Sequence, residues 1–255
     1  MKKGQLVLKI ILFVIIFGGS IFLLFFNPKL KINKWKINGA VLSDEQKIEK
    51  LLEIEMGRMW GPFYRDNFFV AFFRKSRLSN ILKEHFPEIK KANIYPDWDN
   101  NPFNCFKLSI EEREKEGIWC GESAGCFYYD DTGFLFRQSA ESKGPFMVSI
   151  KDSASLNLSL GSVLGNENFV LNLRELYESF SGVPSVAIDE IEVINLNYDF
   201  MVKTNNEWLL YFDPNISAKT QTEVFKGLLV EEKIKINEPL QYIDLRIKNK
   251  AYLMR

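Results

Sequence analysis

Histidine is almost absent from this sequence, and its scarcity excludes most arrangements that perform acid-base catalysis. The 255 residues contain one histidine, His85, so any Ser-His-Asp or Cys-His arrangement would have to use it. His85 lies on a predicted helix beside Phe86, where a structural role is the simpler interpretation. The adjacent carboxylates of Glu111 and Glu112 fall on a predicted strand and point to opposite faces. We therefore predict no catalytic residue and no enzymatic activity.

Phosphate-binding motifs and an excess of positive charge are missing as well. The chain has no G-x-x-x-x-G-K-[ST] and no G-x-G-x-x-G pattern. It carries 33 basic and 33 acidic side chains, and this balance argues against nucleic acid as the main partner. The three cysteines and the single histidine do not have the spacing of a zinc site. We expect no metal, cofactor, nucleic acid or small-molecule substrate.

Cysteine is rare, and two of the three cysteines lie close together. Cys120 and Cys126 bound a short glycine-containing loop between two strand-like runs. A disulfide across the neck of this hairpin is favoured if the domain is extracytoplasmic. Cys105 falls inside a strand-like run and is most simply a buried thiol.

One long apolar run is present, at residues 6–26. From Ile10 to Phe26 it carries no charge. As a helix it would be roughly 32 Å long, about the thickness of the hydrocarbon core of a bilayer, and Lys9 could extend to the interface. A cleaved signal peptide is the alternative, but the run exceeds the usual apolar length and no A-x-A-like site follows it. The sequence predicts a transmembrane helix after a short tail, residues 1–5.

The next part of the chain, residues 27–112, has the order strand, helix, helix, strand, strand. Residues 35–37 alternate and turn at Gly39, and Ser43 with Gln46 resembles a capping box for a helix at residues 44–55. The aromatic stretch 67–73 leads into a second helix that ends at Pro87. Strands are predicted at 89–95 and 103–111.

The remainder, residues 113–255, has the pattern of a mostly antiparallel β domain with two helices. The helices are predicted at 167–180 and 217–229 from their apolar spacing. Short strands separated by turns are predicted at 118–120, 126–129, 134–137, 146–150, 186–195, 199–204, 208–212, 240–246 and 251–254. The fold class is therefore α+β, with two domains after the predicted membrane helix.

This order of elements resembles the FtsQ/DivIB family of bacterial cell-division proteins, which have a membrane anchor, a POTRA domain and a β domain. The resemblance covers nearly the whole chain and is carried by Trp35-Lys-Ile-Asn-Gly39, Phe86-Pro-Glu-Ile-Lys90, Leu108-Ser-Ile-Glu-Glu-Arg-Glu114, Phe127-Tyr-Tyr-Asp-Asp-Thr-Gly133-Phe-Leu-Phe136 and Leu240-Gln-Tyr-Ile-Asp-Leu-Arg246. The aromatic insertion 57–73 and the cysteine pair depart from the family pattern.

The resemblance implies a non-enzymatic scaffold that holds FtsB-like and FtsL-like division proteins at the septum. It implies a single-pass protein of the cell membrane with a cytoplasmic N-terminus and extracytoplasmic C-terminal domains. A terminal strand at a sheet edge can add a partner strand, and by position this edge falls on residues 247–255. The candidate partner-binding residues are Ile247, Ala251, Tyr252, Leu253 and Met254, with Tyr95 and Trp98 near a second edge in the POTRA-like domain.

Other interpretations remain open at this stage. The terminal strand could simply complete the core of the β domain, and alternate residues could do both jobs. Tyr95 and Trp98 could be packing residues. A membrane-anchored enzyme of the cell envelope is a different class, for which a free Cys120 or Cys126 would be the nucleophile. A secretion component would normally carry several POTRA units and a barrel, whose alternating strands are absent.

Overall fold

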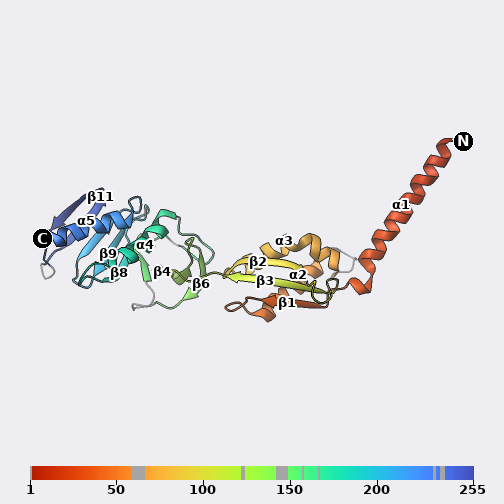
Figure 1. Ribbon diagram of the computed structural model, residues 1–255, viewed down its shortest axis with the longest axis horizontal. Coiled ribbons are helices and arrows are strands. Elements are labelled where there is room, and N and C mark those ends of the chain that lie inside the picture. Colours follow the sequence, from red (N-terminus) through yellow and green to blue (C-terminus); the bar gives the residue numbers. More distant parts are fainter. Residues whose placement is uncertain are drawn as a thin grey trace. The chain divides into compact units, whose positions relative to one another are not determined.

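The chain folds as two compact units in a computed structural model. The structure describes residues 2–58, 67–121, 124–141, 149–156, 158–165, 167–231, 234–235 and 239–255. Unit 1 is Met1–Arg113 and unit 2 is Glu114–Arg255, so the division lies one residue beyond the boundary expected from the sequence. Figure 1 shows the elements of each unit in the colours of the sequence.

The first helix corrects the prediction of a membrane span. Helix α1, Lys2–Phe26, includes the apolar run, and residues 2–5 of the expected tail belong to it. Within the described part of the chain, no helix combines the length and the apolar character needed to cross a bilayer. The transmembrane helix at 6–26 and the single-pass septal localisation built on it are therefore contradicted.

Unit 1 contains a three-stranded sheet with two helices. After the short 3₁₀ helix η1, Pro28–Leu30, come β1 (Lys34–Asn38), α2 (Glu45–Arg58), α3 (Phe68–His85), β2 (Ile89–Pro96) and β3 (Cys105–Glu112). The strand order is β1-β3-β2, with β1 parallel and β2 antiparallel to the central β3. One face of the sheet packs against the helices through Trp35, Ile94, Phe106, Leu108 and Ile110, all of which are buried.

The ends of the unit 1 helices are fixed by side chains that accept backbone hydrogen bonds. The expected capping box is wrong, because Asp44 rather than Ser43 accepts from the backbone N–H groups of Gln46 and Lys47, at 3.0 and 3.3 Å. The backbone N–H of Ser43 donates instead to the Glu112 carboxylate at 2.8 Å. Asn67 caps α3 by accepting from the backbone N–H of Phe69 at 2.8 Å.

The aromatic stretch 67–73 opens α3, as the sequence predicted, while residues 59–66 of the expected insertion lie outside the described residues.

Unit 2 is built on one nine-stranded sheet. Its strands are β4 (Gly117–Gly121), β5 (Gly125–Tyr129), β6 (Leu135–Ser139), β7 (Ser149–Asp152), β8 (Ile188–Val193), β9 (Phe200–Thr204), β10 (Leu209–Phe212), β11 (Tyr242–Ile247) and β12 (Lys250–Met254). The strand order is β12-β11-β10-β9-β8-β7-β4-β5-β6. The β10–β11, β7–β8 and β4–β7 pairs are parallel, and the other five neighbouring pairs in this order are antiparallel. The sheet is therefore mixed but mostly antiparallel, as expected. In the strand predicted at 146–150, residues 146–148 are not among those described.

Helices α4 (Glu167–Phe180) and α5 (Ala218–Val230) pack on one face of this sheet. Phe169 of α4 and Phe225 of α5 share one core with inward-facing strand residues. These include Phe200, Phe212 and Ile243, and all five side chains are at 0 % exposure. Because side chains alternate along a strand, the residues between these core positions lie on the opposite face of the sheet. That alternation decides which residues of the terminal strands are available at the surface.

Candidate partner-binding edge

Strand β12 is the terminal strand at one edge of the unit 2 sheet. It pairs antiparallel with β11, with Ile243 opposite Leu253 and Asp244 opposite Tyr252. Among the described strands it has no neighbour on its other side. Every second residue of an edge strand directs its N–H and C=O groups away from the sheet, and these groups can bond a further strand. The geometry can therefore accept a strand from another chain.

The side chains of β12 divide between the core and the surface. Ala251 and Leu253 are partly buried and pack against the unit 2 core. Tyr252 is 55 % exposed and Met254 is 45 % exposed, and both lie on the face away from the helices. Alternate residues of β12 therefore differ in burial. Completion of the core accounts for Ala251 and Leu253 but leaves Tyr252 and Met254 exposed.

Ile247 lies where the β11–β12 ladder is irregular. The register shifts between Asp244 and Ile247, and Ile247 pairs with Lys250 across the turn. Asn249 in this turn has a φ of 59°, which asparagine tolerates better than most residues. Ile247 is 46 % exposed, so it extends the apolar surface of the edge to the turn.

A pair of tyrosines, Tyr211 and Tyr242, adjoins the edge on the same face, and no motif in the sequence indicates this pair. The rings of Tyr211 on β10 and Tyr242 on β11 meet edge to face at a centroid distance of 5.6 Å. Tyr242 is paired with Met254 of β12 in the ladder. The guanidinium of Arg246 lies 5.4 Å from the centre of the Tyr211 ring. The alternation of apolar and polar residues could have indicated the shared face, but not which strands are neighbours.

Arg246 is held in place by two carboxylates. It donates from Nε and Nη2 to the two oxygens of Asp244, at 2.9 and 2.6 Å, and from Nη1 to Asp199 at 3.3 Å. The hydrogen bonds from Arg246 hold the pKa of Asp244 below its usual range, although partial burial acts in the opposite direction. The same contacts raise the pKa of Arg246. This corner of the sheet is therefore charged but internally paired.

Tyr95 and Trp98 belong to unit 1, whereas the β12 residues belong to unit 2. Tyr95 lies on β2 opposite Lys107 and is 40 % exposed, and Trp98 follows the strand and is 70 % exposed. Both side chains are exposed, so the packing interpretation does not account for most of the Trp98 surface. The two residues remain candidate contact residues of a separate surface.

The loop that carries Trp98 is ordered by a buried carboxylate, Asp97. Its side chain is fully buried and accepts from Lys107 Nζ at 2.8 Å and from Asn100 Nδ2 at 2.6 Å. These contacts, led by the hydrogen bond from Lys107, lower the pKa of Asp97 to about 2 against the effect of burial. Lys107 also contacts Asp99. The sequence predicted a turn here but gave no signal for the burial of Asp97.

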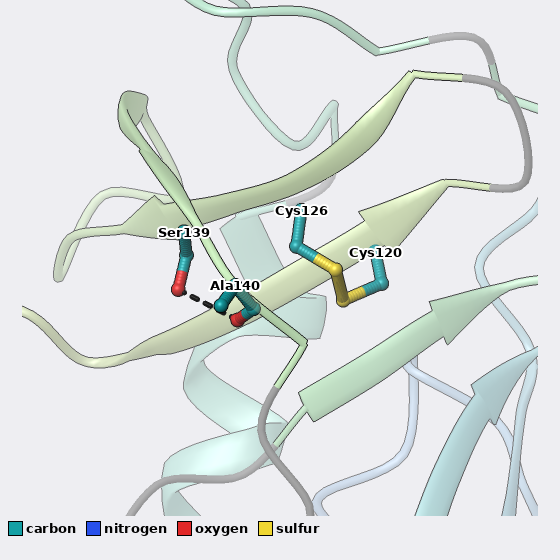
Figure 2. The surroundings of a disulfide bond; sticks show 4 residues. All are labelled: Cys120, Cys126, Ser139 and Ala140. Atoms are coloured by element: carbon teal, nitrogen blue, oxygen red, sulfur yellow. Dashed lines mark hydrogen bonds between the residues drawn. A yellow bond between two sulfur atoms is a disulfide. The ribbon is translucent and has the colours of Figure 1, made fainter.

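Cys120 and Cys126 form a disulfide, with an S–S distance of 2.05 Å. The two residues are directly opposite each other in the β4–β5 ladder, and Figure 2 shows the bond joining these neighbouring strands. Neither sulfur is therefore available as the free nucleophile that the enzyme interpretation needs. Cys105 is a partly buried free thiol whose pKa is raised by burial and by Asp97.

His85 is exposed on α3, where its Nδ1 lies 3.0 Å from the carbonyl oxygen of Ile81. Within the described residues, no group of three or more His, Cys, Asp and Glu side chains has an arrangement that could hold a metal ion.

Comparison with known proteins does not assign the chain to a family. No protein-family model matches it, and no curated protein matches it significantly.

Proposed function

We propose that this protein is a non-enzymatic scaffold that captures a partner by adding the partner's strand to β12. The observation that carries the proposal is the combination of an edge position with exposed Tyr252 and Met254 on that same strand. Strand addition needs unpaired backbone groups for affinity and alternate side chains for specificity. An exposed apolar edge strand is otherwise an aggregation hazard.

The resemblance of the sequence to the FtsQ/DivIB family supports a specific partner class. The strand-helix-helix-strand-strand order of unit 1 and the strand-rich unit 2 agree with the element order on which that resemblance rests. We propose FtsB-like and FtsL-like division proteins as the partners that supply the strand.

Two adjacent proline substitutions test strand addition. Neighbouring residues on a strand direct their N–H groups to opposite sides, so Tyr252→Pro and Leu253→Pro remove N–H groups facing different strands. The variant that removes the outward N–H should keep its thermal unfolding midpoint and lose capture of FtsB-like and FtsL-like proteins from the same genome. The other variant should be destabilised, because it loses a bond to β11.

Two further chains serve as controls in the same co-purification. Tyr252→Ala keeps every backbone group and should weaken capture without abolishing it. A chain truncated after Lys250 lacks most of β12 and should capture nothing. Unchanged capture by both proline variants, each shown to be folded by circular dichroism, would rule out β12 as the binding edge.

A further inference from the structure

One end of unit 1 gathers most of the exposed aromatic side chains of that unit. Beyond α1, the described part of unit 1 exposes seven large apolar side chains, and five of them are aromatic: Phe72, Phe73, Tyr95, Trp98 and Phe103. The other two are Val41 and Ile54. Phe73 is 74 % exposed and Phe103 is 48 % exposed. Scattered apolar residues need no explanation, but a concentration of this kind indicates a contact surface.

The segments that carry these side chains are joined to one another. Phe68, at the start of α3, packs against Phe72 at a centroid distance of 5.8 Å and against Phe103 at 5.4 Å. Phe73 contacts Phe72 at 5.6 Å. The buried ring of Phe68 thus connects the exposed rings of α3 to the loop between β2 and β3.

Contacts to its backbone hold the segment before β1 at the same end of unit 1. Lys31 forms an isolated antiparallel bridge with Asn67. Asn104 donates from Nδ2 to the carbonyl oxygens of Lys29 and Lys31, at 3.0 and 2.7 Å. Three segments that are distant in sequence therefore form one surface, which we call the aromatic end.

The charges of the aromatic end are predominantly positive. Residues 27–36 contain four lysines and no acidic residue, and residues 67–77 contain Arg74, Lys75 and Arg77 and no acidic residue. Lys75 Nζ lies 5.2 Å from the centre of the Phe72 ring, so a cation and an exposed aromatic ring are adjacent. The nearby acids are fewer. Asp97 and Asp99 are both bound to Lys107, and Glu49 and Glu53 of α2 line one pocket together with Lys31.

We propose that the aromatic end docks on the head-group layer of an anionic lipid bilayer. Such a layer is negatively charged at its surface and apolar a few ångströms below, so it matches cations and aromatic rings together. Aromatic side chains favour this interface because their rings tolerate both environments. The contact is peripheral and needs no spanning helix. It is separate from β12 and does not rest on the proposed strand capture.

A label placed at the aromatic end of the full chain tests this contact. In a Cys105→Ser background, Ser76→Cys puts a fluorophore one helical turn from Phe72 and Phe73, at an exposed position. Val41→Cys, at a residue 86 % exposed near Glu112, is the matched control position. Each labelled chain is mixed with vesicles of phosphatidylcholine and phosphatidylglycerol that carry a spin-labelled lipid as a contact quencher.

The quencher should reduce fluorescence at position 76 and leave position 41 unchanged. The reduction should be lost in a Phe72→Ser, Phe73→Ser double variant with an unchanged unfolding midpoint, and it should weaken on phosphatidylcholine alone. Because quenching requires contact, the result is independent of how the rest of the chain reaches the vesicle. Equal quenching at both positions, no quenching at position 76, or quenching that survives the double substitution would overturn the proposal.

Discussion

Arg246 and Asp244 form a bidentate ion pair within strand β11. Arg246 donates from Nε and Nη2 to both oxygens of Asp244, and its backbone N–H also donates to Asp244 Oδ1 at 3.0 Å. The register of the β11–β12 ladder shifts at this place. Because Asp244 takes the backbone donor of Arg246, the pair accompanies the bulge that shapes the beginning of β12.

Replacement of Asp244 should therefore affect the edge more than the core. We expect Asp244→Ala to lower the free energy of unfolding by about 1 kcal/mol, because the pair is partly solvent-exposed. Partner capture by β12 should weaken more than this loss of stability explains. Denaturant unfolding with a parallel co-purification measures both effects. A Glu223→Ala variant, on an exposed position of α5, serves as a control that should change neither. Capture equal to that of the unmodified protein would show that the pair does not shape the edge.

Reduction of the disulfide should have a modest effect. Cys120 and Cys126 are separated by only six positions, and a bond that closes so short a loop removes little entropy from the unfolded chain. We expect Cys120→Ser with Cys126→Ser to lower the free energy of unfolding of unit 2 by about 2 kcal/mol. Partner capture should persist, since β12 and the β4–β5 hairpin are at opposite parts of the strand order. A disulfide-free variant that folds but cannot capture would contradict this separation.

The loop that presents Trp98 should depend on pH through Asp97. Its pKa is lowered from 3.8 to about 2, so the folded state favours the ionised carboxylate. This contribution to stability is fully present above pH 3.8 and is lost as the pH falls toward 2. Thermal unfolding of Asp97→Asn and the unmodified protein should therefore converge across this window. Asp99→Asn, whose side chain is 79 % exposed, is the control and should show a smaller effect at neutral pH. A difference that stays constant with pH would contradict the assignment.

Gly39 should not tolerate a side chain. It has a φ of 88°, and an added Cβ would clash with the backbone carbonyl oxygen of Ile110 on β3. We expect Gly39→Ala to cost at least about 2 kcal/mol of stability, measured by denaturant unfolding. Gly161→Ala is a matched control, because Gly161 has a similar φ of 86° and open space around it. An equal loss of stability at the two sites would mean that the strained backbone conformation alone causes it, and that the contact with β3 adds nothing.

The sequence was most informative where a pattern depends on near neighbours. Helix α4 spans the predicted residues 167–180, because apolar side chains at helical spacing mark a buried stripe. The turn at Gly133 has the expected positive φ, 79°. For the last strand the sequence left open whether its residues complete the core or lie at the surface, and in the structure Ala251 and Leu253 pack on the core while Tyr252 and Met254 are exposed.

The failures occur where a partner comes from far along the chain. The Glu112 carboxylate accepts hydrogen bonds from the backbone N–H groups of Leu42 and Ser43. No local sequence motif predicts this contact, because Glu112 lies on a strand far along the chain. The three parallel pairings of unit 2 were missed because alternation shows which face is buried but not which strand is adjacent. The partners of Arg246 and Asp97 were hidden for the same reason.

The shortness of β12 sets a limit on how strongly its backbone alone can hold anything. A strand of five residues offers only a few outward hydrogen bonds. At about 1 kcal/mol each, they fall short of the roughly 4 kcal/mol that corresponds to a millimolar dissociation constant. Tight binding must then come from anchor side chains that cover Tyr252 and Met254, or from a second, tethered contact that raises the effective concentration. Isolated strand peptides should accordingly be poor competitors of an intact partner.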